Sequence, residues 1–235
     1  CVGSGLENHT KYGEMIYAHS KNDLYVNLFI PSKLKWKERE IELVQQTGFP
    51  DAENTTLTIN TKKEQSFALL LRHPSWVKKG ALKVLVNGKK IKTTSISKGY
   101  IKISRVWENG DEIAIQLPMR TTVEQLPDGK DYYAFMHGPI LLAAKTDTTK
   151  MKGLFAEGGH LAQVASDEKF PIDDMPAIES LPKKLVQKVK LLPGKSLTFS
   201  VKNLSGNKYN NLKLIPFFRL HESRYIMYWK VKNPE

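Results

Sequence analysis

The residues whose types could carry chemistry stand at the start of the chain, where the only cysteine, Cys1, is followed by Ser4, Glu7 and His9. The spacing from Ser4 to Glu7 is that of a capping box, so it predicts a helix that begins there, after a loop with two glycines. Cys1 would then lie just ahead of a helix N-terminus. The partial positive charge at that place favours the thiolate, which is the form that binds a metal or attacks an electrophile.

Each of these residues also has an ordinary structural interpretation. A lone cysteine is often incidental, because metal sites normally bring a second Cys or His at ligand spacing. The spacing from Ser4 favours a capping role for Glu7 over an acid/base role. His9 could approach Cys1 from the helix or remain on the surface with an ordinary hydrogen bond. On the residues alone, both interpretations of Cys1 stay open.

Two further groups could contact a ligand. His221, Arg224 and Tyr225 form a polar cluster beside an aromatic strand. They could reach toward a catalytic pocket, or they could form a buried polar network that holds two domains together. Trp36 and Trp76 could stack on sugar rings, although packing in a core or at an interface is the usual role of aromatic residues beside strands.

Composition limits the classes of function. The chain has 235 residues, which suits two domains, and its single cysteine excludes an internal disulfide framework. No apolar run approaches the roughly 18 residues of a membrane helix, so we expect no membrane partner. The net charge is +12, and much of the excess lies from Lys183 to Glu235, where twelve Lys or Arg residues accompany only Glu222 and Glu235.

Those basic residues are spread singly through alternating segments, which is typical of the solvent side of strands. Without a nucleic-acid motif beside them, we expect no nucleic-acid partner. Binding of another anionic polymer remains an alternative, and it requires that the C-terminal lysines gather on one face.

The elements that must position these residues are mostly strands. The hydrophobic period changes from helical to twofold after about residue 20. Asn87-Gly88 is a strong hairpin signal. In the first half, the predicted strands cover 24–30, 40–44, 55–61, 66–72, 82–86, 100–103 and 112–117. Short strands with frequent turns are typical of a sandwich or jelly roll, and alternation places Leu69 and Leu71 in its core with Leu70 on the opposite face.

The second half is also β-rich. Its predicted strands cover 132–136, 140–144, 185–192, 196–201, 212–216 and 225–229. Residues 146–182 lack periodicity and carry several glycines and prolines, which predicts a long excursion. We therefore expect a helix over 1–20, a first β-sandwich over 21–122 and a second β domain over 123–235.

Several motifs, in the same order along the chain, resemble bacterial glycoside hydrolases of the β-L-arabinofuranosidase type, family 127 and its relatives. The opening segment from Cys1 to Gly13 is similar to the end of their catalytic barrel. The tail from Leu214 to Trp229 resembles an extension of the Bacteroides-like members. Between them, the similar segments are Leu24–Ser32, Leu71–Trp76, Val86–Gly88, Gly99–Tyr100 and His137–Leu141.

The resemblance implies an N-terminal helix that is a remnant of an (α/α)6 barrel, followed by two jelly-roll-like β-sandwich units. In such enzymes three Cys and one Glu hold Zn²⁺, one of those cysteines is the nucleophile, and a separate Glu is the acid/base. Cys1 matches one zinc ligand, and the remaining ligands and catalytic groups match no residue of this chain.

We therefore expect no catalytic residue and no cofactor in this chain, and no activity from it alone. The chain begins with Cys rather than Met, and we expect it to be the C-terminal part of a larger, periplasmic or secreted enzyme. Its expected role is to support the catalytic barrel of that zinc-dependent, retaining enzyme during the degradation of plant-derived carbohydrate. The alternative is an independent carbohydrate-binding sandwich. An exposed row of Trp and Tyr would favour binding, whereas burial of those rings would favour support.

Overall fold

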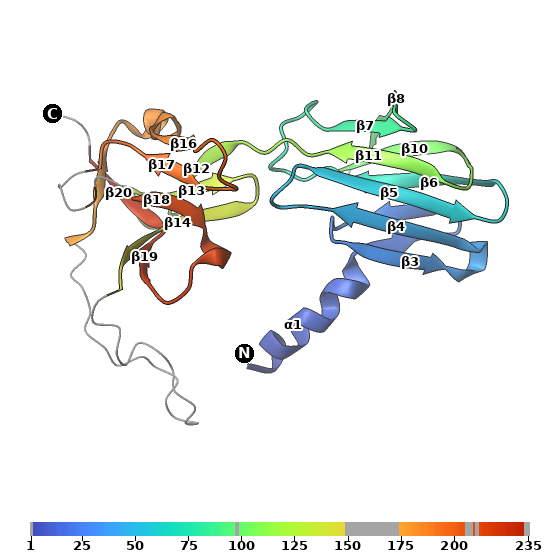
Figure 1. The fold of residues 1–235 in the computed structure, drawn as a ribbon, viewed down its shortest axis with the longest axis horizontal. Coiled ribbons are helices and arrows are strands. Elements are labelled where there is room, and N and C mark those ends of the chain that lie inside the picture. The colour runs from blue at the N-terminus through green and yellow to red at the C-terminus, as the bar shows by residue number, and fades with distance from the viewer. Residues whose placement is uncertain (1, 97–98, 149–173, 205–208, 210–211, 233–235) are drawn as a thin grey trace. The chain divides into compact units, whose positions relative to one another are not determined.

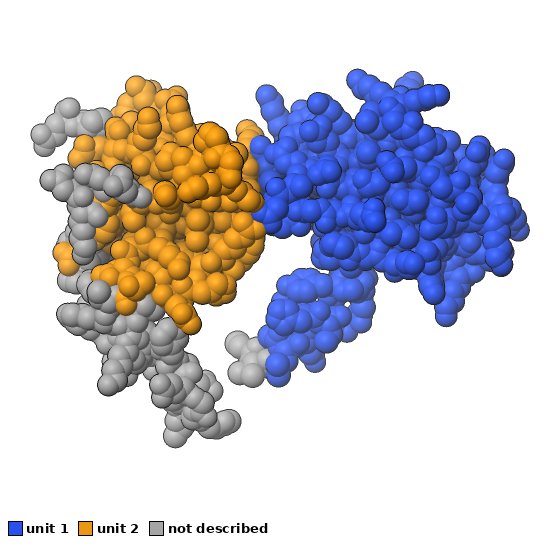
Figure 2. Space-filling model, in the orientation of Figure 1, with its two compact units in different colours: residues 1–119 blue, residues 120–235 orange. Residues whose placement is uncertain are grey.

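The computed structural model describes residues 2–96, 99–148, 174–204, 209 and 212–232. The chain divides into two compact units, Cys1–Met119 and Arg120–Glu235, which Figure 2 shows in different colours. Each unit is mainly β, as the sequence predicts, and the first unit begins with an α-helix.

The N-terminal helix α1 covers Val2–Met15 and is followed by the short strand β1, Tyr17–His19. Two expectations are therefore wrong. The helix ends before residue 20, because residues 17–19 pair with β2 instead. Ser4 does not cap the helix, because the helix already begins at Val2 and Ser4 lies within its first turn.

The first unit is a sandwich of two sheets (Figure 1). The five-stranded sheet has the order β1-β2-β6-β10-β9, and the six-stranded sheet has the order β3-β4-β5-β11-β7-β8. Their strands are β2 Asp23–Val26, β3 Ser32–Trp36, β4 Ile41–Thr47, β5 Asn54–Thr61, β6 Gln65–Arg72, β7 Lys83–Val86, β8 Lys89–Lys90, β9 Thr94–Ile96, β10 Tyr100–Trp107 and β11 Asp111–Gln116.

The core of this unit consists of the inward side chains of both sheets, and β6 shows how alternation builds it. Leu69 and Leu71 belong to the core cluster, whereas Leu70 does not, which confirms the predicted facing. Leu70 is nevertheless buried. On the outer face it lies between its cross-strand neighbours Tyr25 and Lys102, whose apolar parts can cover it.

The predicted hairpin at Asn87-Gly88 is confirmed between β7 and β8. Both residues have positive φ, 50° and 75°, as a type I′ turn requires. The Asn87 side chain also donates to Asp111 Oδ1 and accepts from the Glu112 backbone N–H. The turn is thereby tied to the neighbouring strand β11.

Gln45, a buried polar residue of β4, holds the segment that follows β2. Its Nε2 donates to the carbonyl oxygens of Leu28, at 3.1 Å, and Ile30, at 2.8 Å. The backbone N–H of Asn27 meanwhile donates to Ile16 O. These bonds take residues 27–30 out of the sheet, so the strand predicted for 24–30 ends at Val26.

Tyr17 joins the same network through its hydroxyl, which lies 2.9 Å from Ser32 Oγ and 3.3 Å from Gln45 Nε2. Burial raises the pKa of Tyr17 above its ordinary value, and the hydrogen bonds to Ser32 and Gln45 oppose that shift. The folded state therefore disfavours the phenolate more than the unfolded state does.

This shift predicts a loss of stability at alkaline pH. The contribution of Tyr17 is fully present below the unfolded pKa of about 10 and is lost as the pH rises through the raised folded pKa. Replacing Tyr17 by Phe should flatten that loss. Urea denaturation at pH 8 and above pH 10 measures it, and an equal alkaline loss in Tyr17→Phe would contradict the assignment.

The second unit contains one sheet of nine strands within the described residues, and its long path has the order β15-β20-β13-β14-β18-β17-β16. β12 pairs with β13, and β19 pairs with β14. The strands are β12 Thr121–Gln125, β13 Tyr132–His137, β14 Ile140–Asp147, β15 Ala177–Glu179, β16 Val189–Leu191, β17 Phe199–Val201, β18 Lys213–Pro216, β19 Arg224–Ile226 and β20 Tyr228–Lys232.

β13 and β14 pair with each other only next to the turn that joins them. Farther from that turn, the last two strands, β19 and β20, take up the free edges of β14 and β13. β14 pairs with β13 through residues 140–142 and, on the same edge, with β19 through residues 144–147. β13 in turn pairs with β20. The single strand predicted for 225–229 is therefore two strands, and Trp229 is fully buried.

Two other expectations for this unit need correction. The first half of the strand predicted for 185–192 belongs instead to a 3-10 helix, η3, over Pro182–Lys188, with proline in its first turn. Only the short β16 follows it. The predicted excursion at 146–182 falls mostly outside the described residues, but its described end contains the strand β15.

Within the described part of the chain, no helix combines the length and the apolar character that crossing a membrane requires.

Candidate functional site

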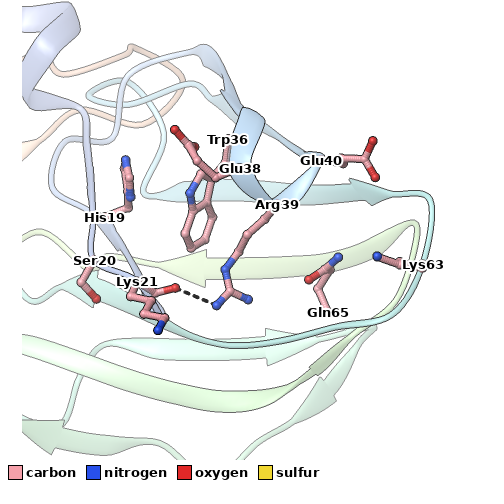
Figure 3. A pocket seen from close by; sticks show the side chains of 9 residues that line it. All are labelled: His19, Ser20, Lys21, Trp36, Glu38, Arg39, Glu40, Lys63 and Gln65. Atoms are coloured by element: carbon pink, nitrogen blue, oxygen red, sulfur yellow. Dashed lines mark hydrogen bonds between the residues drawn. The ribbon is translucent and has the colours of Figure 1, made fainter.

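The first unit carries a pocket of about 780 Å³ beside Trp36, shown in Figure 3. Its walls come from three turns that are distant in sequence: the end of β1, the turn after β3 and the turn between β5 and β6. The lining residues are His19, Ser20, Lys21, Trp36, Glu38, Arg39, Glu40, Lys63 and Gln65.

The turn after β3 forms the wall that carries most of the charge. β3 ends at Trp36, and the 3-10 helix η1 covers Lys37–Arg39. Glu40 then adopts a left-handed conformation, with φ of 52°. This reversal lets β4 return along β3 and places Glu38 and Arg39 at the pocket.

Arg39 joins the two sheets at this place. Its guanidinium donates to Lys21 O at 2.7 Å, to Asn22 Oδ1 at 3.0 Å and to Ser66 O at 3.1 Å. The same group lies 5.0 Å from the centre of the Trp36 ring, within the range of a cation–π contact. Figure 3 shows the hydrogen bond from Arg39 to Lys21 as a dashed line.

The pocket offers hydrogen-bond donors and acceptors on exposed, flexible side chains. His19, Glu38 and Glu40 are all exposed to solvent. A catalytic acid/base pair works where enclosure and neighbouring charge separate the two pKa values, and this open arrangement does not provide that enclosure. The pocket can therefore bind polar groups but is poorly suited to general acid/base chemistry.

The two tryptophans proposed for sugar stacking have different surroundings. Trp36 is only 3% exposed and contacts Phe67 and His19 as well as Arg39. Trp76 is half-buried, and one face of its ring stacks on Phe49 with ring centres 5.8 Å apart. Both rings already have protein partners.

The cluster proposed around β19 is not a buried network within the second unit. His221 and Tyr225 are exposed, and Arg224 is half-buried. Tyr225 packs edge-on against Phe217, with ring centres 5.3 Å apart.

Of the candidate residues at the start of the chain, the structure describes Glu7 and His9. Cys1 lies outside the described residues. Glu7 and His9 are exposed on α1, where the Glu7 carbonyl accepts a hydrogen bond from Thr10 Oγ1. No group of three or more His, Cys, Asp or Glu residues within the described ranges could hold a metal ion.

The sequence reasoning missed Arg39. Its role depends on partners 17 to 27 residues away in the chain, so no local pattern marks it. The only local signal for Arg39 is that it stands three residues after Trp36, in the turn that follows β3.

Comparison with known proteins identifies the first unit. Residues 23–119 match the model of the β-L-arabinofuranosidase GH127 middle domain. The first unit is therefore similar to a GH127 middle domain. Residues 122–231, in the second unit, match a family described only as a domain of unknown function.

Solved structures of GH127 enzymes share the fold. A GH127 β-L-arabinofuranosidase from Geobacillus stearothermophilus T6 aligns with a TM-score of 0.65 and 20% identity, over 94% of this chain and 35% of that one. A GH127 β-arabinofuranosidase aligns with a TM-score of 0.61 and 20% identity, over 93% of this chain and 37% of that one. A further glycoside hydrolase gives a TM-score of 0.61 and 19% identity, over 92% and 37%.

The chain thus spans little more than a third of the length of these GH127 structures. Among curated proteins, none matches it. The similarity to glycoside hydrolases rests on residues 23–119 and on the shared fold.

Proposed function

We propose that this chain is a non-catalytic β region of a glycoside hydrolase related to the β-L-arabinofuranosidases, and that it supports and shapes a catalytic barrel elsewhere in the enzyme. The single observation that carries the proposal is the match of residues 23–119 to the GH127 middle domain. The proposed substrate of the whole enzyme is plant-derived carbohydrate, and its proposed location is periplasmic or secreted.

The surroundings of the four tryptophans favour a role in supporting the catalytic barrel. They do not favour an independent carbohydrate-binding module. Trp107 and Trp229 are fully buried, and Trp36 nearly so. Trp76 is stacked on Phe49. A module that binds sugars by stacking needs exposed aromatic faces, and these four rings are used mainly for packing.

Helix α1 supports the proposed barrel partner. At 100° per residue, Gly5, Leu6, His9, Tyr12 and Gly13 fall on one side of the helix. Leu6 is 74% exposed, and Tyr12 is also exposed. An isolated helix of 14 residues is marginal in water, so a helix with an uncovered apolar side is expected to gain its stability from a partner.

The two glycines on that side of α1, Gly5 and Gly13, also favour a helical partner. Gly costs about 1 kcal/mol relative to Ala in a helix. In the described part of the chain, no atom outside the helix lies within 4 Å of the space that a Cβ at Gly5 or Gly13 would fill. Glycine is therefore not required here by neighbours within the unit, and close approach of a partner helix would explain it.

The residues present do not fit the zinc site that the resemblance implies. That site needs three cysteines and one glutamate, whereas the chain has one cysteine. We derive no catalytic step through zinc in this chain, and Cys1 as one ligand of a site completed elsewhere stays a proposal.

Hydrogen exchange tests the proposed support. It should be measured on α1 in this chain alone and in the same chain joined to its catalytic domain. We expect strong protection of residues 5–15 only in the longer protein, with β6 equally protected in both as the internal control. Equal, strong protection of the helix in both proteins would contradict the proposal.

A further inference from the structure

Exposed lysines form a straight row across the sheet of the second unit. The register places Lys190 of β16 opposite Ser200 of β17, and Ser200 opposite Lys213 of β18. β14 continues the row, because its ladder with β18 ends at the pair Ala144 and Leu214, and Lys145 and Lys213 lie just beyond that pair. Lys145 in turn pairs with Tyr225 of β19.

Alternation of burial shows that these side chains share one face. The residue adjacent to each of them along its strand is buried on the other face: Val189, Phe199, Leu214, Ala144 and Ile226. Lys190, Lys213, Lys145 and Tyr225 are exposed, and Ser200 is half-buried. We call Lys145, Lys190 and Lys213 the lysine row.

A second pair of lysines lies next to the row in the sequence, just before the start of β16 and after the end of β17. Lys188 is the last residue of η3 and Lys202 directly follows β17, and a hydrogen bond joins them from Lys202 N to Lys188 O. Like charges directly opposite each other destabilise a sheet. Within the described residues, none of these five lysines forms an ion pair.

An aromatic group closes one end of the row. Tyr225 is 46% exposed, and its ring packs edge-on against Phe217, which is also exposed. The row therefore combines three cations on one face with an exposed ring. Neighbouring strands are about 4.8 Å apart, so the five strands span roughly 19 Å.

We propose that the lysine row and Tyr225 bind a linear acidic polysaccharide, one whose sugar rings carry carboxylates. The ammonium groups would pair with carboxylates on successive sugars, and the ring of Tyr225 would stack on a sugar face. This inference rests on the proposed function, because the relation to glycoside hydrolases selects a polysaccharide over other polyanions. It gives the second unit a role in retaining substrate.

Affinity electrophoresis and calorimetry with polygalacturonate test the proposal, using the whole chain. We expect binding that weakens with added salt, because screening reduces attraction between exposed charges. The triple variant Lys145→Gln, Lys190→Gln, Lys213→Gln should bind roughly tenfold more weakly, since each exposed ion pair adds only a little. Tyr225→Ala should also weaken binding, without changing the dependence on salt.

A matched triple variant separates the row from net charge. Lys78, Lys79 and Lys89 are exposed residues of the first unit, and their replacement by Gln removes the same charge. This control should bind polygalacturonate like the unaltered chain.

Three results would overturn the proposal: equal loss in both triple variants, equal affinity for neutral arabinan, or equal affinity for single-stranded DNA at the same salt concentration. None of them affects the protection of α1, so failure of this inference is distinguishable from failure of the proposed support.

Discussion

Replacing Leu69 by alanine should lower the free energy of unfolding of the first unit by about 2–5 kcal/mol. Leu69 is fully buried on the inward face of β6, between the neighbouring strands β2 and β10. Truncation removes apolar contacts and leaves a cavity, because strands paired on both sides cannot close over it. Urea denaturation followed by tryptophan fluorescence measures the change.

Leu85→Ala is the matched control. Leu85 lies on β7 in the same unit, but its side chain is exposed. The same truncation there should change the free energy of unfolding by less than about 1 kcal/mol. An unchanged denaturation midpoint for Leu69→Ala would contradict the assignment of Leu69 to the inward, core-facing side of β6.

Replacing Trp107 by alanine should have an effect of similar size, about 3–5 kcal/mol. Trp107 is fully buried, packs against Phe67 with ring centres 5.8 Å apart, and donates from Nε1 to Phe67 O at 3.1 Å. The substitution removes a large apolar volume together with a buried hydrogen bond. The free energy of unfolding from urea denaturation, followed by circular dichroism, measures the loss.

The variant Trp107→Phe separates these two contributions, because it keeps a ring and removes the donor. Trp229→Phe in the second unit is the comparison: Trp229 is equally buried, but its Nε1 has no hydrogen-bond partner within the described residues. We expect Trp107→Phe to cost about 1 kcal/mol more than Trp229→Phe. The reverse order would contradict the role of the bond to Phe67.

Strands with clear alternation could be predicted from the sequence because the pattern itself is the physical cause of their facing. In β4, Ile41 and Leu43 point into the core, as the alternating sequence requires. The predicted strand boundaries are wrong where hydrogen bonds from residues distant in the sequence decide whether a segment joins the sheet. Residues 27–30 have a strand-like composition but are held by Gln45 and Ile16 outside the sheet.

The candidate sites depend still more on distant contacts. Alternation predicted that Lys190 and Lys213 face solvent. That they share one row with Lys145 follows from the register of four strands, which no local pattern specifies. The role of Arg39 likewise depends on carbonyl groups from other turns.

We propose above that this chain supports catalysis without performing it. Release of L-arabinose from a β-L-arabinofuranoside by the purified chain, with added Zn²⁺, tests it most directly, and a GH127 β-L-arabinofuranosidase serves as the positive control. We predict no release above the uncatalysed rate. Turnover at an ordinary enzymatic rate, on the order of 10 s⁻¹, would contradict the claim.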